Sequence, residues 1–581
     1  MRVPLLILAT GAALCAASTP AIEQLHTMIP MRDGVHLAAN IFRPGTGRVP
    51  TILVRTPYGK GTALSPAYRT FVDHGYAVVM QDVRGRYESE GNFRPLQQEP
   101  QDGNDTLNWI AHQPWSNGKI GMTGGSYVGI VQWKVAVLNN PHLKAIFAAV
   151  AGDDDYRDRF YSAGGAMKVG QRLEWMAENM KVPGYIPDFH KFVRHLPLLT
   201  ADVAATGRTS RMFQDAARHS AFDSFWRAIS TREQLQKIHV PIFSVGGWYD
   251  NFVESDLEAY SALRKSSGLN RILIGPWPHN MSYKFAGVDF GPHAAIPVRG
   301  LQLQWFDQWL MGKDTPMVSR PPAKIFLMGV NEWREYHEWP PEGVRREEYY
   351  LESGAHANTL NGDGTLKRTA RHHADDRSAD HYVYDPRDPT PTRGGAVCCN
   401  PRIFPWGPMD QRIVEERDDV LVYTSKPLKQ NLEVIGPVEA VLYVSTSAPD
   451  TDFTAKLVDI FPDGTARNLT DGILRLRYRG SLSEPRLATP GEVYRITIDA
   501  GVTSNVFLAG HSIRVEISSS NFPRFDRNPN TGTVIAKETR LVKANQTVYH
   551  DREHPSHIVL TVLGGETVTA RRVSPPSVRA R

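Results

Sequence analysis

A single serine stands in a glycine-rich stretch that reads Gly121-Met122-Thr123-Gly124-Gly125-Ser126-Tyr127-Val128-Gly129. The first residues of this stretch read as the end of a strand, and a helix is predicted to begin near Tyr127. A strand that turns sharply into a helix lifts the serine hydroxyl clear of the sheet, and small neighbours let the strained turn pack closely. The pattern therefore indicates a nucleophilic serine, although glycines that only permit a tight turn would look the same.

Two further residues have the types and positions that a nucleophilic serine requires. Asp250 follows the predicted strand 242–247, and His279 follows the predicted strand 271–275. A histidine takes the proton of the serine and an acid orients the histidine, and the order Ser, Asp, His at successive strand ends suits this chemistry. Alone, Asp250 could cap the next helix and His279 could be an ordinary loop histidine. Together with Ser126 they predict a catalytic triad, which requires no cofactor.

Acyl transfer also needs donors for the negative charge that develops on the carbonyl oxygen. The backbone N–H of Tyr127, directly after the nucleophile, is one expected donor. The second should come from the loop after an early strand, which here is 57–60. That loop has no run of glycines, but it offers the Tyr58 hydroxyl, unless Tyr58 simply packs on the surface of its turn.

Strands and helices alternate on both sides of this stretch, which predicts a mostly parallel sheet covered on both faces. Residues 20–155 and 238–320 share this pattern, whereas residues 156–237 carry only helix-like runs and are expected to form a helical cap over the site. The apolar segments that read as buried strands are 50–56, 76–82, 119–123, 143–150, 240–247 and 270–275.

From residue 321 to residue 574 short alternating segments are separated by clusters of Gly, Pro, Asn and Asp. This texture predicts a separate all-β domain, either a sandwich or a jelly roll. The tail 575–581 is expected to be disordered. Cys398 and Cys399 lie in this half, and adjacent cysteines form either a strained vicinal disulfide or two buried thiols. No metal site is expected.

Residues 1–19 have one positive charge, a short apolar run and then small residues, as a secretory signal peptide does. We therefore expect a secreted or periplasmic protein with no stable membrane span. Lys and Arg number 66 against 61 Asp and Glu, so the small excess of positive charge indicates no nucleic-acid partner.

Several motifs resemble those of the cocaine esterase family of serine hydrolases, which is related to X-prolyl dipeptidyl peptidases, glutaryl acylases and α-amino acid ester hydrolases. The resemblance runs through nearly the whole chain after the signal segment. The segments that carry it are 81–91, 113–122, 124–129, 246–250, 275–279, 450–457 and 469–472.

This resemblance implies an α/β-hydrolase domain, a helical cap and a C-terminal jelly-roll domain. It also assigns the triad to Ser126, Asp250 and His279, and the oxyanion hole to Tyr58 and Tyr127. The expected substrate is a small ester or amide, with a short peptide as the alternative if the chain acts as an X-prolyl dipeptidyl peptidase. An inactive scaffold that binds a glycan or a protein is a more distant alternative.

Acidic residues at 153–155 could bind a substrate amine, as acids do in the related α-amino acid ester hydrolases. The alternative is a solvated loop, or salt bridges from Asp153, Asp154 and Asp155 to Arg157 and Arg159. Trp248, close before Asp250, is a further candidate for substrate contact.

Overall fold

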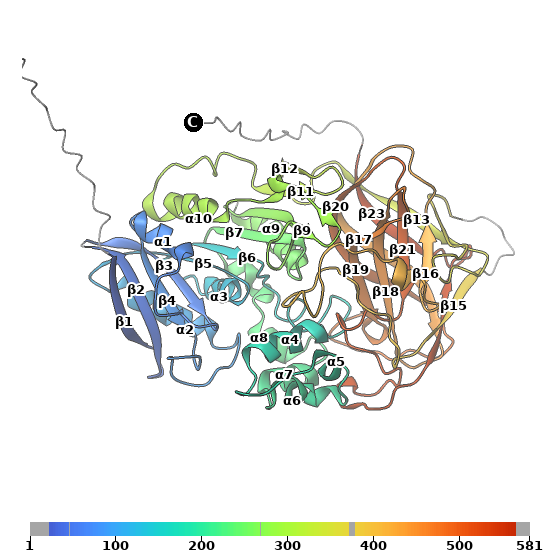
Figure 1. Cartoon of the computed structure of the whole chain (residues 1–581), viewed down its shortest axis with the longest axis horizontal. Coiled ribbons are helices and arrows are strands. Elements are labelled where there is room, and N and C mark those ends of the chain that lie inside the picture. The colour runs from blue at the N-terminus through green and yellow to red at the C-terminus, as the bar shows by residue number, and fades with distance from the viewer. Residues whose placement is uncertain (1–21, 46, 268, 371–377, 565–581) are drawn as a thin grey trace, which may run out of the picture.

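Two sheets and a group of helices make up the protein, whose computed structural model describes residues 22–45, 47–267, 269–370 and 378–564 (Figure 1). The predicted signal segment 1–19 and the predicted tail 575–581 lie outside the described residues. Among the described helices, none has both the length and the apolar character needed to cross a bilayer.

The first sheet has ten strands in the order β1-β2-β4-β3-β5-β6-β7-β8-β11-β12. Its central strands from β4 to β11 are parallel, while β1, β2 and β12 add antiparallel edges. The strands are β1 (Ile22–Pro30), β2 (His36–Pro44), β3 (Val49–Thr56), β4 (Ala77–Asp82), β5 (Ser116–Gly125), β6 (Leu143–Ala149), β7 (Ile242–Tyr249), β8 (Arg271–Pro278), β11 (Ala323–Leu327) and β12 (Glu332–Tyr336).

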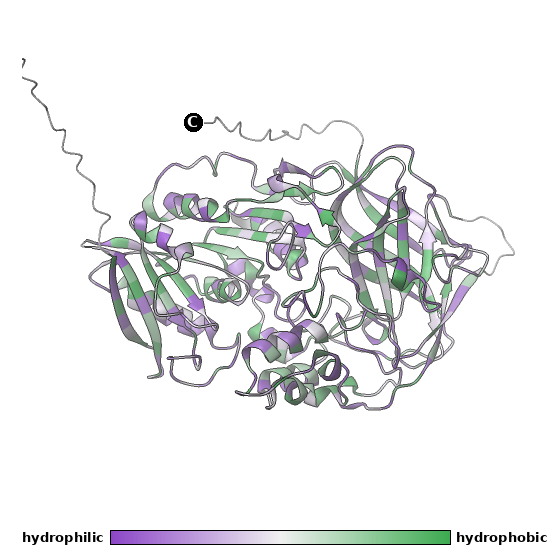
Figure 2. Cartoon of the chain, viewed as in Figure 1, coloured by the Kyte–Doolittle hydropathy of each residue, from purple (hydrophilic) through white to green (hydrophobic). Residues whose placement is uncertain are grey.

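Helices cover both faces of this sheet, as the run of apolar strands predicted. One face packs against α2 (Glu99–Ala111), α3 (Tyr127–Ala136) and α9 (Val253–Ser267), and the other packs against α1 (Pro66–Asp73) and α10 (Val298–Phe306). Strands such as β4, which is buried along its whole length, appear largely in the hydrophobic colour in Figure 2. The α/β domain is therefore confirmed.

The predicted helical cap is also present between residues 156 and 237. It contains α4 (Val169–Asn179), α5 (Phe189–Phe192), α6 (Ala201–Thr206), α7 (Arg211–Arg218) and α8 (Ser224–Ile229). In Figure 1 these helices lie beside both the first sheet and the second domain. Their apolar residues form a core of their own that also includes Val397, Phe404 and Phe522 of the C-terminal half.

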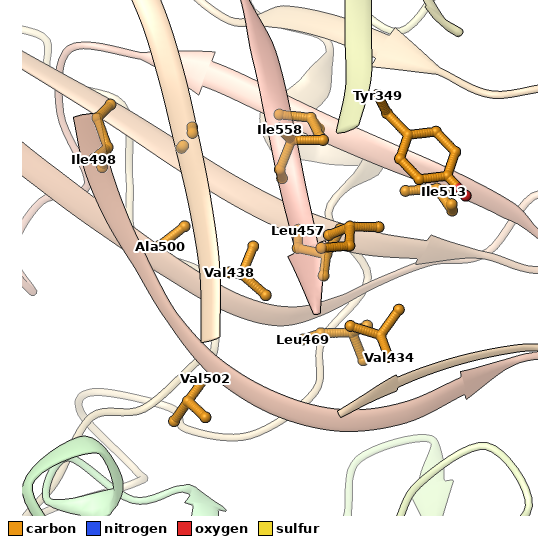
Figure 3. Close-up of a cluster of buried hydrophobic side chains, with 14 of the residues drawn as sticks. Tyr349, Val434, Val438, Leu457, Leu469, Ile498, Ala500, Val502, Ile513 and Ile558 are labelled. Carbon is orange, nitrogen blue, oxygen red and sulfur yellow. The ribbon is translucent and has the colours of Figure 1, made fainter. Parts of the chain in front are cut away.

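The C-terminal half is an all-β domain of eleven strands in one sheet system. Alternate residues of these strands point into one apolar core, part of which is drawn in Figure 3. The strands are β13 (Val344–Glu352), β14 (Thr365–Lys367), β15 (Ala379–Tyr384), β16 (Leu421–Thr424), β17 (Leu432–Thr446), β18 (Asp452–Ile460), β19 (Ala466–Arg475), β20 (Tyr494–Phe507), β21 (Ser512–Ser518), β22 (Ala544–Tyr549) and β23 (His557–Leu563).

The first two strands after residue 321, where the β domain is predicted to begin, do not join the second sheet. Strand β11 pairs in parallel with β8 of the first sheet, with Ala323 opposite Ile272, and β12 continues that sheet. The strands of the second sheet begin only at β13. Strand β11 fits the alternating texture predicted after residue 321, but alternation does not say which sheet a strand joins.

Buried charged groups connect the cap to the β domain. The Arg475 guanidinium at the end of β19 donates to the carboxylates of Asp452 and Asp526 at 2.9 to 3.2 Å. The Asp526 carboxylate in turn accepts a hydrogen bond of 2.6 Å from the backbone N–H of Met167, just before α4. The backbone N–H of Arg475 also donates to the Gly164 carbonyl at 2.9 Å. The position of α4 therefore depends on the β domain.

Candidate active site

Ser126 stands on the sharp turn between β5 and α3. Its φ of 56° and ψ of −130° are strained for a residue with a Cβ, and its N–H donates to the Ala149 carbonyl of the neighbouring strand at 2.9 Å. A side chain at Gly124, whose φ is 145°, would come within 2.2 Å of Val128. The turn therefore requires glycine at position 124, and it presents the serine hydroxyl above the sheet.

Asp250 and His279 meet because β7 and β8 are neighbouring parallel strands. Tyr249 and Pro278 lie opposite each other in the ladder, so the residues that follow them emerge side by side. His279 Nδ1 lies 2.7 Å from the Asp250 carboxylate, and His279 Nε2 lies 3.0 Å from Ser126 Oγ. Asp250 is fully buried and also accepts from the Phe252 N–H at 3.0 Å. With its proton on Nδ1, the histidine can accept the serine proton.

The two predicted oxyanion donors, the Tyr58 hydroxyl and the Tyr127 N–H, both lie next to this serine. Tyr58 follows β3, and its hydroxyl accepts a hydrogen bond of 3.2 Å from Trp175 Nε1. Burial raises the pKa of Tyr58, against smaller opposite effects of its hydrogen bonds to Trp175 and Ser126, so the phenol stays protonated and able to donate. Tyr127 is the first residue of α3, so its backbone N–H has no partner within the helix.

The side chain of Tyr127 has a separate, structural task. Its hydroxyl donates to a Glu99 carboxylate oxygen at 2.8 Å and accepts from the Leu96 N–H at 3.0 Å. Its ring stacks on that of Trp175 with an interplanar angle of 6°. These contacts hold the start of α3, and therefore the backbone N–H of Tyr127, in place.

A cavity of about 230 Å³ opens over Ser126. The α/β domain, the cap and the β domain all contribute to its wall. The lining residues are Tyr58, Pro95, Leu96, Ser126, Tyr127, Ile130, Arg159, Gln171, Arg172, Trp175, Glu178, Asn179, Met212, Asn251, Phe252, His279, Cys398 and Cys399.

Four residues proposed from the sequence as substrate contacts do not reach this cavity. Asp153 pairs with Arg232 at 2.7 Å, Asp154 with Arg157 at 2.7 Å, and Asp155 with Arg159 at 2.7 Å and with Lys134. Trp248 is buried and donates from its ring nitrogen to the Phe326 carbonyl at 2.7 Å. The alternative of salt bridges to Arg157 and Arg159 therefore describes Asp154 and Asp155. The three acids are buried rather than solvated, and burial raises the pKa of Asp153 to about 6.

Most of the cavity wall contributed by the cap and the β domain escaped the sequence interpretation. Trp175 and Arg172 belong to a stretch that only its helical pattern singled out, and neither has a local signature. Cys398 and Cys399 are adjacent in the sequence, and the structure joins them in a disulfide at the cavity. No pattern in the sequence says that a loop of the β domain faces the nucleophile.

Comparison with known proteins places both halves of the chain. The family model for X-Pro dipeptidyl-peptidase (S15 family) matches residues 33–281, and that for the X-Pro dipeptidyl-peptidase C-terminal non-catalytic domain matches residues 317–559. The match to the first model includes Ser126, Asp250 and His279.

Individual relatives match along nearly their whole length. Cocaine esterase from Rhodococcus sp. (strain MB1 Bresler) is 40% identical over 569 residues, which cover 93% of this chain and 98% of that protein. An aminopeptidase from the marine sediment archaeon Thaumarchaeota archaeon superposes with a TM-score of 0.81 at 26% identity, covering 97% of this chain and 99% of the other. An α-amino acid ester hydrolase superposes with a TM-score of 0.80 at 26% identity, covering 95% and 98%. The chain belongs to the cocaine esterase family of serine hydrolases.

Proposed function

We propose that the protein hydrolyses carboxylic esters through an acyl-enzyme on Ser126, with His279 as general base and Asp250 as the acid that orients it. The observation that carries this proposal is the unbroken hydrogen-bonded series from the Asp250 carboxylate through His279 to Ser126 Oγ, at the floor of a cavity. The reaction class needs no group that the chain itself does not supply.

In the first half of the proposed reaction, Ser126 Oγ bonds to the ester carbonyl carbon while its proton moves to His279 Nε2. The carbonyl oxygen becomes an oxyanion, which the Tyr58 hydroxyl and the Tyr127 N–H stabilise. The bond to the alkoxide then breaks, and His279 gives its proton to the departing alcohol. In the second half, water attacks the acyl-enzyme by the same route, and the carboxylic acid leaves.

The lining of the cavity favours esters over peptides with a free amino end. An X-prolyl dipeptidyl peptidase must bind a substrate ammonium group, for which a carboxylate is the natural partner. Asp153, Asp154 and Asp155 are turned toward their own cations. Among the described lining residues the one carboxylate is Glu178, which is exposed and accepts from Asn400 at 3.2 Å. The 40% identity with a protein named cocaine esterase supports the same choice.

Dipeptidyl-peptidase activity is the second candidate, because the matching family model carries that name and one similar structure is an aminopeptidase. The two candidates separate in one experiment, in which turnover of 4-nitrophenyl butyrate is compared with turnover of Gly-Pro-4-nitroanilide. We expect the ester to be the much better substrate. Faster turnover of the anilide would reverse the assignment.

A fluorophosphonate probe tests the nucleophile itself. The probe should label the wild-type protein and the variant Ser65→Ala, whose side chain makes no capping hydrogen bond, but not Ser126→Ala. Ser126→Ala should also lose ester hydrolysis. Labelling that persists in Ser126→Ala would assign the nucleophile to another residue.

We further propose that the protein is exported, on the strength of the charge, apolar run and small residues in the segment 1–19. Expression of the full chain followed by N-terminal sequencing of the protein from the extracellular or periplasmic fraction should find cleavage near Ala17. Recovery of the intact chain from the cytoplasm alone would contradict export.

A further inference from the structure

Arg172 stands in the wall of the active-site cavity without an anionic partner. It lies on α4, and its Nε and Nη2 both donate to the Arg159 carbonyl, at 3.0 and 2.6 Å. Its guanidinium also lies over the rings of Phe160 and Trp175, with 4.6 and 5.7 Å to the ring centroids. Among the described residues, no carboxylate acts on Arg172. Burial, reinforced by Arg159, lowers the pKa of Arg172 to about 9.

The residues around Arg172 do not offset its charge. Arg159 also lines the cavity, but it shares the carboxylate of Asp155 with Lys134, so two cations already face one anion. Glu178 lies at the exposed side of the cavity and forms no ion pair with Arg172 in the described part of the chain. A partly buried cation in such a place is unfavourable unless an anion joins it.

A second cavity beside the active-site cavity is rich in arginine side chains. This second cavity, of about 610 Å³, shares Pro95 and Met212 with the first one and is lined by four arginines, namely Arg86, Arg94, Arg208 and Arg211. Arg211 pairs with Asp215 at 3.4 Å, whereas the other three form no ion pair with a described residue. Asp215 is the one carboxylate among the described residues of this lining, so cations outnumber anions there. An excess of positive charge in a hollow concentrates anionic ligands near the active site.

We propose that the enzyme prefers esters whose acyl group ends in a carboxylate, that is, half-esters of dicarboxylic acids, and that Arg172 binds this carboxylate. This inference rests on the ester hydrolysis proposed above and names its substrate class. The acyl group is the part that stays on Ser126 inside the small cavity, where Ile130, Trp175 and Phe252 offer apolar surface for a methylene chain. The leaving alcohol departs, and the arginines of the second cavity attract the anionic substrate.

Two esters that differ only in charge test this preference. In the 4-methylumbelliferyl half-ester of adipic acid the acyl chain ends in a carboxylate, and in 4-methylumbelliferyl 6-methylheptanoate an isopropyl group of similar shape replaces it. A charge-assisted hydrogen bond contributes enough to change kcat/KM by about 10- to 100-fold. We therefore expect the wild-type enzyme to favour the half-ester by about tenfold or more.

The variant Arg172→Gln should lower the ratio of the two kcat/KM values by about 10- to 100-fold. The ratio cancels any loss of folded enzyme. Arg69→Gln removes the same charge from a helix that lines neither cavity, and it should keep the wild-type ratio. If Arg172→Gln does not fold, competitive inhibition of the wild-type enzyme by adipate, compared with adipamide, measures the same recognition, and adipate should inhibit more strongly.

Equal kcat/KM values for the two esters in the wild-type enzyme, or a ratio that Arg172→Gln leaves unchanged, would overturn the inference. In that case the neutral ester would still be hydrolysed and Ser126 would still react with a fluorophosphonate, so ester hydrolysis itself would stand. Loss of both hydrolysis and labelling in the wild-type protein would overturn the proposed function together with this inference.

Discussion

Tyr58 and Tyr127 have the same side chain but different tasks at the active site. Tyr58 turns its hydroxyl toward Ser126 and the Trp175 ring nitrogen, so its side chain is the expected donor. The hydroxyl of Tyr127 is fully engaged with Glu99 and Leu96, so its backbone N–H is the expected donor. The two donors therefore respond differently to mutation.

The variant Tyr58→Phe should lower kcat for ester hydrolysis by roughly 10² to 10³, because one of two oxyanion donors is lost. KM and the thermal midpoint should change little, since Tyr58 is 37% exposed and keeps its ring. Steady-state kinetics and thermal unfolding measure both effects, with Tyr68→Phe on α1 as the matched control. An unchanged kcat would assign the Tyr58 hydroxyl to packing.

Among the residues of the active site, the sequence predicted only those whose positions follow from the order of the strands. Ser126, Asp250 and His279 follow strand ends, and strand ends of a parallel sheet meet at one edge, so their meeting could be predicted. Arg172 and Trp175 reach the cavity because α4 packs across the site. That packing depends on contacts distant in sequence, which no local pattern reports.

The turn from β5 into α3 explains why two of its glycines are not equivalent. Gly124 has a φ of 145° and no room for a Cβ, whereas a Cβ at Gly125 would lie 3.4 Å from the Ala149 carbonyl, an ordinary contact. The sequence alone does not distinguish the glycines of this stretch. The structure shows that glycine is required at position 124 but not at position 125.

The variant Gly124→Ala should therefore lower the thermal midpoint and the fraction of fluorophosphonate-reactive protein, with a cost of about 1–3 kcal/mol for the strained backbone alone. The matched variant Gly125→Ala should fold like the wild type. Thermal unfolding and active-site titration measure both variants. Equal stability of the two variants would show that the turn can relax around an added methyl group.

Helix α4 also carries a carboxyl group whose pKa is shifted upward. Burial, and then the charge of Glu178, raise the pKa of Glu174 to about 7, above the value of about 4.3 expected in an unfolded chain. Between these two values the folded protein holds a proton that the unfolded chain has released. The contribution of Glu174 to the free energy of unfolding therefore falls as the pH rises through this window.

We expect Glu174→Gln, which cannot ionise, to gain thermal stability relative to the wild type as the pH is raised from about 5 to about 8. Thermal midpoints of both proteins across this range, in one ionic strength, measure the difference. The exposed Glu233→Gln is the matched control. A difference between Glu174→Gln and wild type that stays constant with pH would contradict the raised pKa.

At the scale of the whole molecule, the β domain acts as a support for the active site. Arg475 at the end of β19 joins Asp452 and Asp526, and Asp526 holds the chain just before α4. The helix that carries Arg172 and Trp175 is thus positioned by a domain whose family model is described as non-catalytic. A substitution that breaks these ion pairs should therefore lower activity although it does not touch the active site.

Removing the cation in Arg475→Met should destabilise the protein by about 3–5 kcal/mol, because two buried carboxylates lose their partner. The exposed Arg345, which pairs with the partly buried Glu347, offers the control Arg345→Met, for which a change of about 0–1 kcal/mol is expected. We expect both the thermal midpoint and the rate of ester hydrolysis to fall in Arg475→Met. Similar midpoints for the two variants would show that the junction adds little.

The sequence also predicted the order of the domains better than their assembly. The α/β pattern, the helical stretch and the β pattern all appear where they were expected, except that β11 and β12 belong to the first sheet and not to the second. These two strands extend the first sheet because β11 finds β8 as a parallel neighbour. Parallel pairing joins segments that are far apart in the chain, so alternation within a segment does not reveal it.

Cys398 and Cys399 lie late in the chain, so the part of the cavity wall that they form is completed late in synthesis. On the ribosome, chains are synthesised from the N-terminus and domains fold as they emerge. Ser126, Asp250 and His279 are all present before the loop that places Cys398 and Cys399 at the cavity. A nascent chain thus contains the proposed triad and the cap before it contains the part of the cavity wall that the β domain supplies.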